Sequence, residues 1–329
     1  MKKLFAFAVA LAATITAGAQ NIAVVNPSNS TSIYQTLDEA IIKAEAGSII
    51  YIPGGGFAVT DNAKIDKKLT IMGVSHRGDT DNVDGATIIS GNLNFVKGSS
   101  HSAVLGVYVS GNVNIATKED SVTNFTMRYC NVNAINVNNS KSSGMLINQC
   151  YLRGESNFGN CNVRLENNIL LRASNIKGGT INHNVITTCS YFGQDRSKSL
   201  CNINSSTIAM NFFLSGGNDT VSGSNNLSTN NCRNEGSWGD NPIVLPTGTK
   251  WEEVFKAHKG VTIVSDYHLS EKWANSKDPD LTGIGIYGDS GNDFSDEALA
   301  PIPRIVSKKV AEKTDALGNL EIEVTVKAQ

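Results

Sequence analysis

The chain has 329 residues and a formal net charge of −2, with only 18% charged residues. This balance gives no basic field that would attract nucleic acid, so the sequence predicts no nucleic-acid partner. The 30 glycines, together with many Asn and Ser residues, favour short strands joined by tight turns over a helical bundle.

The N-terminal 20 residues have the three parts of a secretory signal peptide. Lys2 and Lys3 precede an apolar run over residues 4–15, and the small residues 17–19 provide a cleavage site. A buried N-terminal helix is the alternative interpretation. No later stretch has about 18 consecutive apolar residues, so no transmembrane segment is expected. The sequence therefore predicts a signal peptide at 1–20 and an exported protein that is periplasmic, cell-surface or extracellular.

A helix followed by two strands is predicted over residues 34–75. Thr36 and Glu39 have the spacing of a capping box, and an apolar stripe follows before Gly47, which is a natural helix stop. The apolar run 48–52 predicts a buried strand, and 69–74 predicts a second one. An ordinary surface helix beside a sheet is the alternative for this segment.

A six-residue pattern recurs between residues 127 and 228. Its copies have apolar residues at the first and sixth places and Asn or Cys at the fourth, although the copy at 223–228 lacks both apolar residues. If the copies stack as successive strands, about 4.8 Å apart, each amide can hydrogen-bond to its neighbours above and below. The fourth places form a predicted structural ladder: Cys130, Cys150, Asn168, Asn184, Asn211 and Asn226.

Two solenoid architectures compete for this repeat. Leucine-rich repeats also place Asn or Cys after an apolar rhythm, and residues 122–132 fit that template. The other copies have Ser142 and Gly179 where that template needs apolar residues, and their spacing leaves little room for a helix in each unit. A parallel β-helix with variable turns fits the pattern better.

The helix and strands of residues 34–75 resemble the opening of secreted bacterial right-handed parallel β-helix proteins of the pectin-lyase-like superfamily. With the ladder included, the resemblance covers roughly residues 21–245. It implies an all-β fold: a single-stranded right-handed parallel β-helix (a solenoid) over 21–245, with an N-terminal capping helix. None of the superfamily's catalytic motifs can be matched residue by residue, so the resemblance concerns the fold and not the activity.

Residues 246–329 are predicted to form a C-terminal capping or accessory segment that is rich in strands. Residues 250–258 predict a short helix, 261–269 a strand and 301–329 a strand or hairpin, while 278–291 resemble a closing segment of secreted bacterial β-helix proteins. Such a segment can cover the exposed strand edges of a solenoid. Attachment or partner docking is the alternative role.

Six cysteines in an exported chain raise the question of disulfide bonds. Cys130 and Cys150 stand where other copies of the pattern have Asn, which suits a small buried side chain better than half of a bridge. The chain has no Cys-x-x-Cys pair and no zinc-type Cys/His spacing. Free thiols are therefore expected, and no metal site is predicted from them.

Stacked acids, which a sugar-cleaving site would need, are not visible on the regular copies. The acids between residues 104 and 235 stand at offsets from the ladder that never repeat. Adjacent strands would place equal offsets about 5 Å apart, the separation that a retaining hydrolase requires. The sequence therefore favours a non-catalytic protein.

Two polar regions are candidate ligand-binding sites. The insertion at 189–201 combines aromatic rings with mixed charges, which suits a sugar ring, although a solvated loop is the alternative. Residues one and two places before the ladder would align into polar columns that could bind an extended glycan or form a solvated face. The candidates are Tyr191, Phe192, Asp195, Arg196 and Lys198 in the insertion, and Arg128, Asn148, Glu166 and Asn182 in the column two places before the ladder.

The predicted function is a non-catalytic carbohydrate-binding or surface structural module whose partner is a polysaccharide or glycan. The alternative is a polysaccharide lyase or glycoside hydrolase with a loop-built active site. No cofactor is predicted. The acid clusters at 78–85 and 278–280 are calcium candidates that lack the full ligand spacing of a known loop.

Overall fold

The computed structural model is an all-β protein in which strands account for 45% of the chain and helices for 7%. The predicted signal peptide lies outside the described residues. The described residues are 21–77, 85–187, 199–214, 221–233, 239–258, 265–288, 291, 293–296, 304–311, 313–314 and 317–327.

The N-terminal end of the fold combines a short helix with an antiparallel pairing. Strand β1 (Ile22–Val25) pairs antiparallel with both β2 (Thr31–Tyr34) and β3 (Ile49–Tyr51). Helix α2 (Leu37–Lys43) begins after Thr36, whose hydroxyl accepts the backbone N–H of Glu39 at 3.2 Å. Its buried side chains Leu37, Ala40 and Ile41 belong to the central core, as the apolar stripe predicted.

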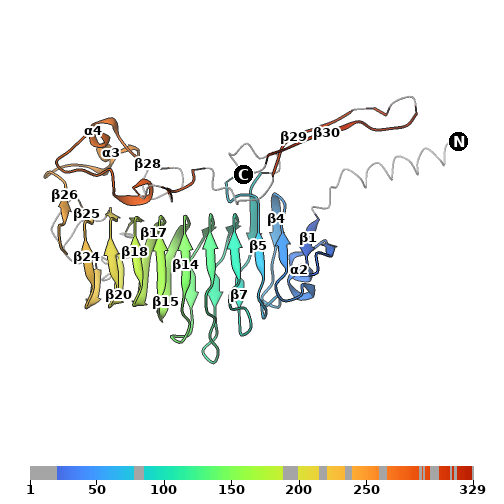
Figure 1. Ribbon diagram of the computed structural model, residues 1–329, viewed down its shortest axis with the longest axis horizontal. Coiled ribbons are helices and arrows are strands. Elements are labelled where there is room, and N and C mark those ends of the chain that lie inside the picture. Colours follow the sequence, from blue (N-terminus) through green and yellow to red (C-terminus); the bar gives the residue numbers. More distant parts are fainter. Residues whose placement is uncertain are drawn as a thin grey trace.

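Beyond this end, the chain passes repeatedly through three columns of parallel strands (Figure 1). The first column contains β3, β5 (Thr70–Met72), β8 (Ala103–Leu105), β11 (Thr126–Arg128), β14 (Met145–Asn148), β16 (Val163–Glu166), β18 (Thr180–Asn182), β21 (Thr207–Ala209) and β24 (Leu227–Thr229). The second contains β4 (Gly55–Ala58), β6 (Thr87–Ser90), β9 (Tyr108–Val109), β12 (Asn131–Val132), β15 (Tyr151–Cys161), β17 (Ile169–Lys177), β19 (Val185–Ile186), β22 (Phe212–Phe213), β25 (Cys232–Arg233) and β26 (Ile243–Val244). The third contains β7 (Leu93–Phe95), β10 (Val113–Ile115), β13 (Ile135–Val137), β20 (Leu200–Asn204) and β23 (Val221–Ser224), joined by the far ends of the long strands β15 and β17.

Each circuit of the chain lies directly on the previous one. Strands β11, β12 and β13 follow one another along the chain, and the next strand, β14, pairs in parallel with β11, with Met127 beside Ile147. We call residues 21–245 the shaft. Among the described residues no helix lies between β3 and β26, which is incompatible with the leucine-rich alternative.

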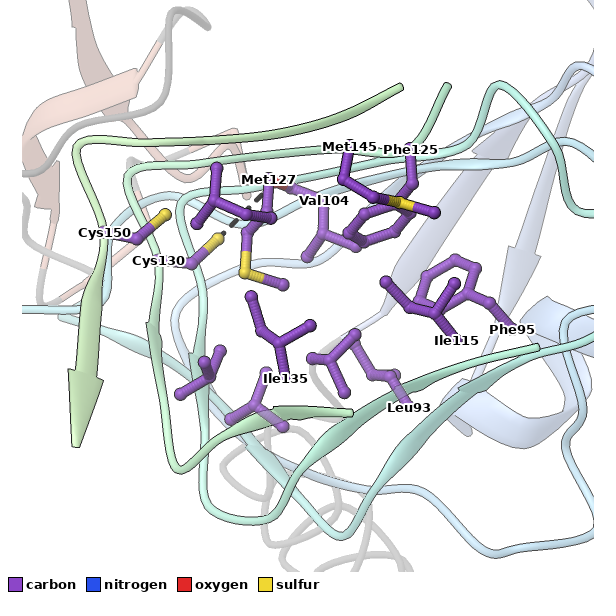
Figure 2. Close-up of a cluster of buried hydrophobic side chains, with 14 of the residues drawn as sticks. Leu93, Phe95, Val104, Ile115, Phe125, Met127, Cys130, Ile135, Met145 and Cys150 are labelled. Carbon is purple, nitrogen blue, oxygen red and sulfur yellow. Dashed lines mark hydrogen bonds between the residues drawn. The ribbon is translucent and has the colours of Figure 1, made fainter. Parts of the chain in front are cut away.

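The centre of the shaft is filled by side chains from all three columns. Figure 2 shows Phe95 and Phe125 packed together, and their ring centroids are 4.8 Å apart in an edge-on arrangement. Met127 and the two thiols of Cys130 and Cys150 point into the same interior. The alternating inward side chains of each short strand therefore build one continuous apolar core.

A hydrogen-bonded ladder of amides runs along the corner between the first and second columns. Asn168 donates from Nδ2 to Asn184 Oδ1 at 3.1 Å, and Asn184 donates in the same way to Asn211 at 2.9 Å. Asn211 then donates to Asn231 Oδ1 at 2.9 Å. The ladder therefore continues at Asn231, and its predicted continuation at Asn226 is wrong.

Asn226 belongs to a different corner of the shaft. Its Oδ1 accepts the backbone N–H of Ser206 at 3.0 Å, and its Nδ2 donates to the Ile203 carbonyl at 2.7 Å. The pairing of Phe212 with Cys232 sets the register of the last rung, and this pairing puts Asn231 above Asn211. Two Asn-Asn pairs, 225–226 and 230–231, follow the regular copies, and the sequence prediction placed the ladder at the first of them.

The thiols occupy the first rungs of the same ladder. Cys130 Sγ donates to the Arg128 carbonyl at 3.1 Å, and the backbone N–H of Cys150 donates to Asn168 Oδ1 at 2.8 Å. Among the described cysteines, Cys130, Cys150, Cys161 and Cys232 are free thiols, and Cys201 Sγ accepts a hydrogen bond from Arg172 at 2.8 Å. Cys189 lies outside the described residues.

Every rung turns this corner through one residue in the left-handed conformation. The residue just before each ladder position has a φ between 52° and 57°: Tyr129, Gln149, Asn167, His183, Met210 and Asn230. Gly106, at φ 63°, makes the same turn before Val107, so the stacking extends one rung earlier than the sequence pattern showed. We call these residues the corner turns.

Candidate functional site

The predicted binding residues fall into two groups with different outcomes. The aromatic and charged insertion, with Tyr191, Phe192, Asp195, Arg196 and Lys198, lies outside the described residues. The candidates in the polar column all lie on the first column of strands, and their contacts can be examined directly.

Hydrogen bonds join three residues of the polar column two places before the ladder. Arg128 Nε donates to Asn148 Oδ1 at 3.0 Å, and the fully buried Asn148 donates onward to the Glu166 carbonyl at 3.2 Å. Glu166 accepts a bidentate contact from Arg164, with the shortest N–O distance at 2.8 Å. Asn182 Oδ1 is buried and finds no hydrogen-bond partner among the described residues. The structure therefore aligns these four residues, but hydrogen bonds join only Arg128, Asn148 and the Glu166 backbone, and the Glu166 carboxylate is paired with Arg164.

The polar column one place before the ladder is covered by the C-terminal part of the chain. Gln149 Oε1 accepts the backbone N–H of Ser295 at 2.8 Å, and Asn167 Nδ2 donates to the Ile286 carbonyl at 3.2 Å. The Met210 carbonyl accepts the N–H of Gly285 at 2.8 Å. This column is therefore not an open glycan groove in the described structure.

The covering segment contains several short elements. We call the described residues between 246 and 296 the strap. They include α3 (Trp251–Val254), β27 (Phe255–Ala257), β28 (Asp266–Leu269), α4 (Glu271–Ala274) and the 3-10 turn η1 (Gly285–Tyr287), and Figure 1 shows them along one side of the shaft. The hairpin of β29 (Arg304–Val310) and β30 (Ile322–Lys327) follows.

The strap packs on an apolar column on the outer surface of the shaft. This outer column consists of the first residue after each ladder position from Cys150 onward: Tyr151, Ile169, Val185, Phe212 and Cys232. The strap contributes Trp251, Val254, Phe255, Tyr267, Trp273, Leu281, Ile284, Ile286 and Phe294 to the same buried cluster. The protein therefore has a second hydrophobic core, outside the shaft and separate from the first.

Aromatic rings dominate this second core. The ring of Phe212 meets Phe255 edge-on at 5.1 Å and Trp251 at 5.9 Å, measured between centroids. Trp251 also donates its indole N–H to the Leu214 carbonyl at 2.9 Å, which ties α3 to the shaft. Such offset and edge-on ring pairs hold the strap beyond the contribution of buried area alone.

A pocket of about 390 Å³ lies where the strap meets the outer column. Its apolar lining includes the buried side chains Phe212, Tyr267, Leu281 and Ile284. Polar or partly exposed side chains also line it: Lys256, His268, Glu271, Asn275, Thr282 and Tyr287. An apolar surface with a few convergent polar groups is the usual character of a small-ligand site.

Two carboxylates hold one imidazole beside this pocket. His268 Nδ1 lies 2.7 Å from Asp266 Oδ1, and His268 Nε2 lies 4.0 Å from Asp296 Oδ2. The imidazole stacks on the Tyr287 ring at 3.8 Å between centroids, and the Tyr287 hydroxyl bonds to Asp296. Asp266 and His268 are two residues apart on strand β28, so both side chains leave the same face.

Burial and charge set the protonation of this cluster. Burial, reinforced by the Asp296 carboxylate, raises the pKa of the Tyr287 phenol above its ordinary value. Burial also acts to raise the pKa of Asp266, but hydrogen bonds from the His268 backbone and side chain outweigh it and the pKa is lowered. At neutral pH the cluster therefore contains a protonated phenol and an ionised Asp266.

The chemistry of the cluster favours holding a ligand over cleaving it. Both imidazole nitrogens of His268 face carboxylates, and the raised pKa of Tyr287 makes a tyrosinate base unavailable at neutral pH. In the shaft, Glu155 and Glu166 pair with Arg172 and Arg164. These acids are engaged in ion pairs and do not form a sugar-cleaving pair.

The calcium candidates of the sequence have separate outcomes. The acids at 79, 81 and 84 lie outside the described residues. Asp280 Oδ1 accepts both the N–H and the hydroxyl of Thr282, at 3.0 Å and 2.7 Å, which fixes a turn. Within the described part of the chain, no group of three His, Cys, Asp or Glu side chains could hold a metal ion.

One feature of the sequence indicates the shaft side of the strap pocket. The two residues after each ladder position are both apolar at residues 151–152, 169–170, 185–186 and 212–213. Successive strand residues point to opposite faces, so adjacent apolar pairs indicate a strand that is buried on both sides. The identity of the covering segment has no such repeated signal.

Comparisons with protein-family models, with curated proteins and with solved structures found no match to this chain. Among the described residues no helix combines the length and apolar character needed to cross a membrane.

Proposed function

We propose that this protein is an exported, right-handed parallel β-helix of the pectin-lyase-like kind that binds carbohydrate in the pocket between strap and shaft. The stacked parallel columns and the α2 cap support the fold part of the proposal. The signal-peptide pattern at 1–20 supports export, to the periplasm, the cell surface or the medium.

The pocket is the observation that carries the binding proposal. A pyranose ring has an apolar face and a rim of hydroxyl groups, and it is bound by aromatic surfaces surrounded by hydrogen-bonding groups. The pocket supplies the rings of Tyr267 and Tyr287, while Lys256, Glu271 and Thr282 supply donors and acceptors. Its volume of about 390 Å³ is in the range of small-ligand sites.

The arrangement supports binding more than catalysis. A glycoside hydrolase needs two carboxyl groups on either side of the scissile bond, about 5–9 Å apart according to mechanism. The carboxylates of Asp266 and Asp296 instead lie on either side of one imidazole. The lyase or hydrolase alternative is therefore secondary, and incubation with oligosaccharides distinguishes binding from cleavage.

The test is binding of purified mature protein to a panel of neutral, acidic and amino-sugar oligosaccharides, followed by calorimetry. Ala274 lines the pocket and is exposed on α4, so Ala274→Trp should fill the site and abolish binding. The matched control is Ala58→Trp, which adds the same ring to an exposed alanine of β4.

The outcomes separate the two functions. Binding that Ala274→Trp abolishes and Ala58→Trp preserves supports the proposal. Binding that survives Ala274→Trp removes the site from this pocket and returns attention to the insertion at 189–201. Release of reducing ends or unsaturated products by the wild type makes the protein an enzyme.

A further inference from the structure

One wall of the pocket is attached to the shaft by the side chains of two corner turns. Asn167 contacts the carbonyl of Ile286, and Gln149 contacts the backbone N–H of Ser295. Both amides are nearly or fully buried. The segment that they hold includes Tyr287, which lines the pocket and bonds to Asp296.

We infer that Asn167 and Gln149 are positioning residues, which hold the described residues 284–288 and 293–296 on the shaft and thereby fix the wall against which a bound sugar rests. This inference rests on the proposed function. It assigns to the corner column a role different from the two alternatives that the sequence left open, a glycan-binding surface and a solvated face.

The turns themselves do not require an amide side chain. The same left-handed conformation is adopted by Tyr129, His183 and Met210 on other rungs. Asn tolerates this conformation well, but Gln gains no comparable local advantage from it. The turn alone therefore does not account for Gln149, and hydrogen bonds to the strap give both amides a role beyond the turn.

The Ile286 carbonyl connects the pocket wall both to the shaft and to the residues around Phe294. It accepts one hydrogen bond from Asn167 Nδ2 at 3.2 Å and another from the backbone N–H of Phe294 at 2.8 Å. The first bond attaches η1 to the shaft, and the second attaches residues 293–296 to η1. Ser295, next to Phe294, is then held by Gln149 at 2.8 Å.

Glycine substitutions test this role with little disturbance of the turns. Glycine adopts a positive φ without steric cost, so Asn167→Gly and Gln149→Gly delete the amides and keep the corner geometry. Asn167→Asp is a second variant, because its carboxylate has a similar size but cannot donate to the Ile286 carbonyl. The matched control is Asn230→Gly, which alters a corner turn at φ 52° whose backbone N–H donates to the Asp240 carbonyl of the shaft.

Three readouts are taken on the full mature protein: hydrogen exchange of residues 284–296, ultraviolet titration of tyrosine and affinity for the best-binding oligosaccharide of the panel. Asn167→Gly and Asn167→Asp should speed exchange of this segment and weaken binding about five- to tenfold, as expected for one lost buried hydrogen bond. Tyr287 should titrate nearer its ordinary range, because the loosened wall buries it less. Asn230→Gly should change none of the three.

The failures of the two proposals can be told apart. Unchanged exchange in Asn167→Gly, or faster exchange with unchanged affinity, overturns the positioning role while leaving the pocket intact. A wild-type protein that binds no oligosaccharide sinks the proposed function, and the role in binding assigned to the two amides falls with it.

Discussion

The two hydrophobic cores of this protein are built in different ways. The core inside the shaft is made from the same positions of every circuit, and an amide ladder fixes the corner beside it. The core outside the shaft joins one repeated position, the outer column, to a strap whose residues occur only once. Repetition therefore determines the scaffold, whereas a single-copy segment creates the pocket.

This difference separates stability from recognition. Each stacked circuit of strands is supported by its neighbours on both sides, so its stability is distributed over the shaft. The strap is attached to one surface, and we expect it to open without unwinding the shaft, as low-stability functional segments commonly do. The two cores should therefore unfold separately.

The largest effect is expected from Phe212→Ala. Phe212 is 2% exposed, lies on the outer column and contacts Trp251 and Phe255. Loss of such a ring typically costs about 3–5 kcal/mol. We expect the strap to detach first, seen as a shift in tryptophan fluorescence at a temperature where the strand circular dichroism is unchanged.

The control for this prediction lies on the inner side of the same strand. Phe213 belongs to the shaft core, so Phe213→Ala should lower the melting of the strands themselves. If both variants lower one common transition, the two cores are a single cooperative unit and the comparison fails.

The next effect is expected from Asn168→Leu, in the ladder. Asn168 is fully buried, and its replacement by Leu removes the acceptor of the buried Cys150 N–H. It also removes one of the two donors to Asn184 Oδ1, which keeps only the backbone N–H of residue 168. Each unsatisfied buried group costs about 1–3 kcal/mol. The strand melting temperature should fall, while the fluorescence of the strap should change only at the same temperature.

Asn133→Leu is the matched control, because Asn133 is exposed and bonds to Asn112 at the surface. It should leave melting almost unchanged. Equal melting temperatures of Asn168→Leu and the wild type would mean that the Asn168 amide does not stabilise the stacked strands.

A smaller effect is expected at low pH. Because the pKa of Asp266 is lowered in the folded protein, its contribution to stability is present above the unfolded pKa of about 3.9. That contribution is lost as the pH falls through the lower folded pKa. The strap fluorescence should therefore show an acid transition that Asp266→Asn abolishes and Asp61→Asn, at an exposed shaft carboxylate, retains. An acid transition that is identical in Asp266→Asn would assign it to other carboxylates.

The smallest effect concerns the thiols, which report on opening without altering the fold. Burial raises the pKa of Cys161 to about 12, and it also raises the pKa of Cys150. These thiols should not react with a thiol reagent in the native protein, because the thiolate is the reactive form. They should react after denaturation without reductant. Rapid reaction of Cys150 in the native state would show that the shaft opens more readily than the strap.

The sequence could predict the inner core because its signal repeats. The apolar residues on either side of Asn168 and Asn184 recur with the same offsets, so one physical argument applies to every rung. The prediction went wrong at the last rung, where Ser228 and Arg233 replace the apolar residues that mark the other copies. There only the strand register identifies Asn231.

The pocket could be predicted only in part. The apolar pair Phe212–Phe213 indicates a strand buried on both faces, but no local pattern says that Tyr267 and Ile284 cover its outer side. Those contacts join residues that are distant in sequence and occur once. The polar corner column was identified correctly as a set of aligned residues, yet its neighbours in the strap were not visible in the sequence.

The ladder positions 130, 150, 168, 184, 211 and 231 are separated by 20, 18, 16, 27 and 20 residues. Despite these unequal lengths, Ile181 still pairs with Ile208 and Val185 with Phe212 across the longest step. The length of a connection therefore leaves the stacking of the described strands unchanged, at about 4.8 Å per circuit. A peptide graft between residues 187 and 199 should consequently appear at a known height on the molecule, which makes this level a natural place to display a foreign epitope.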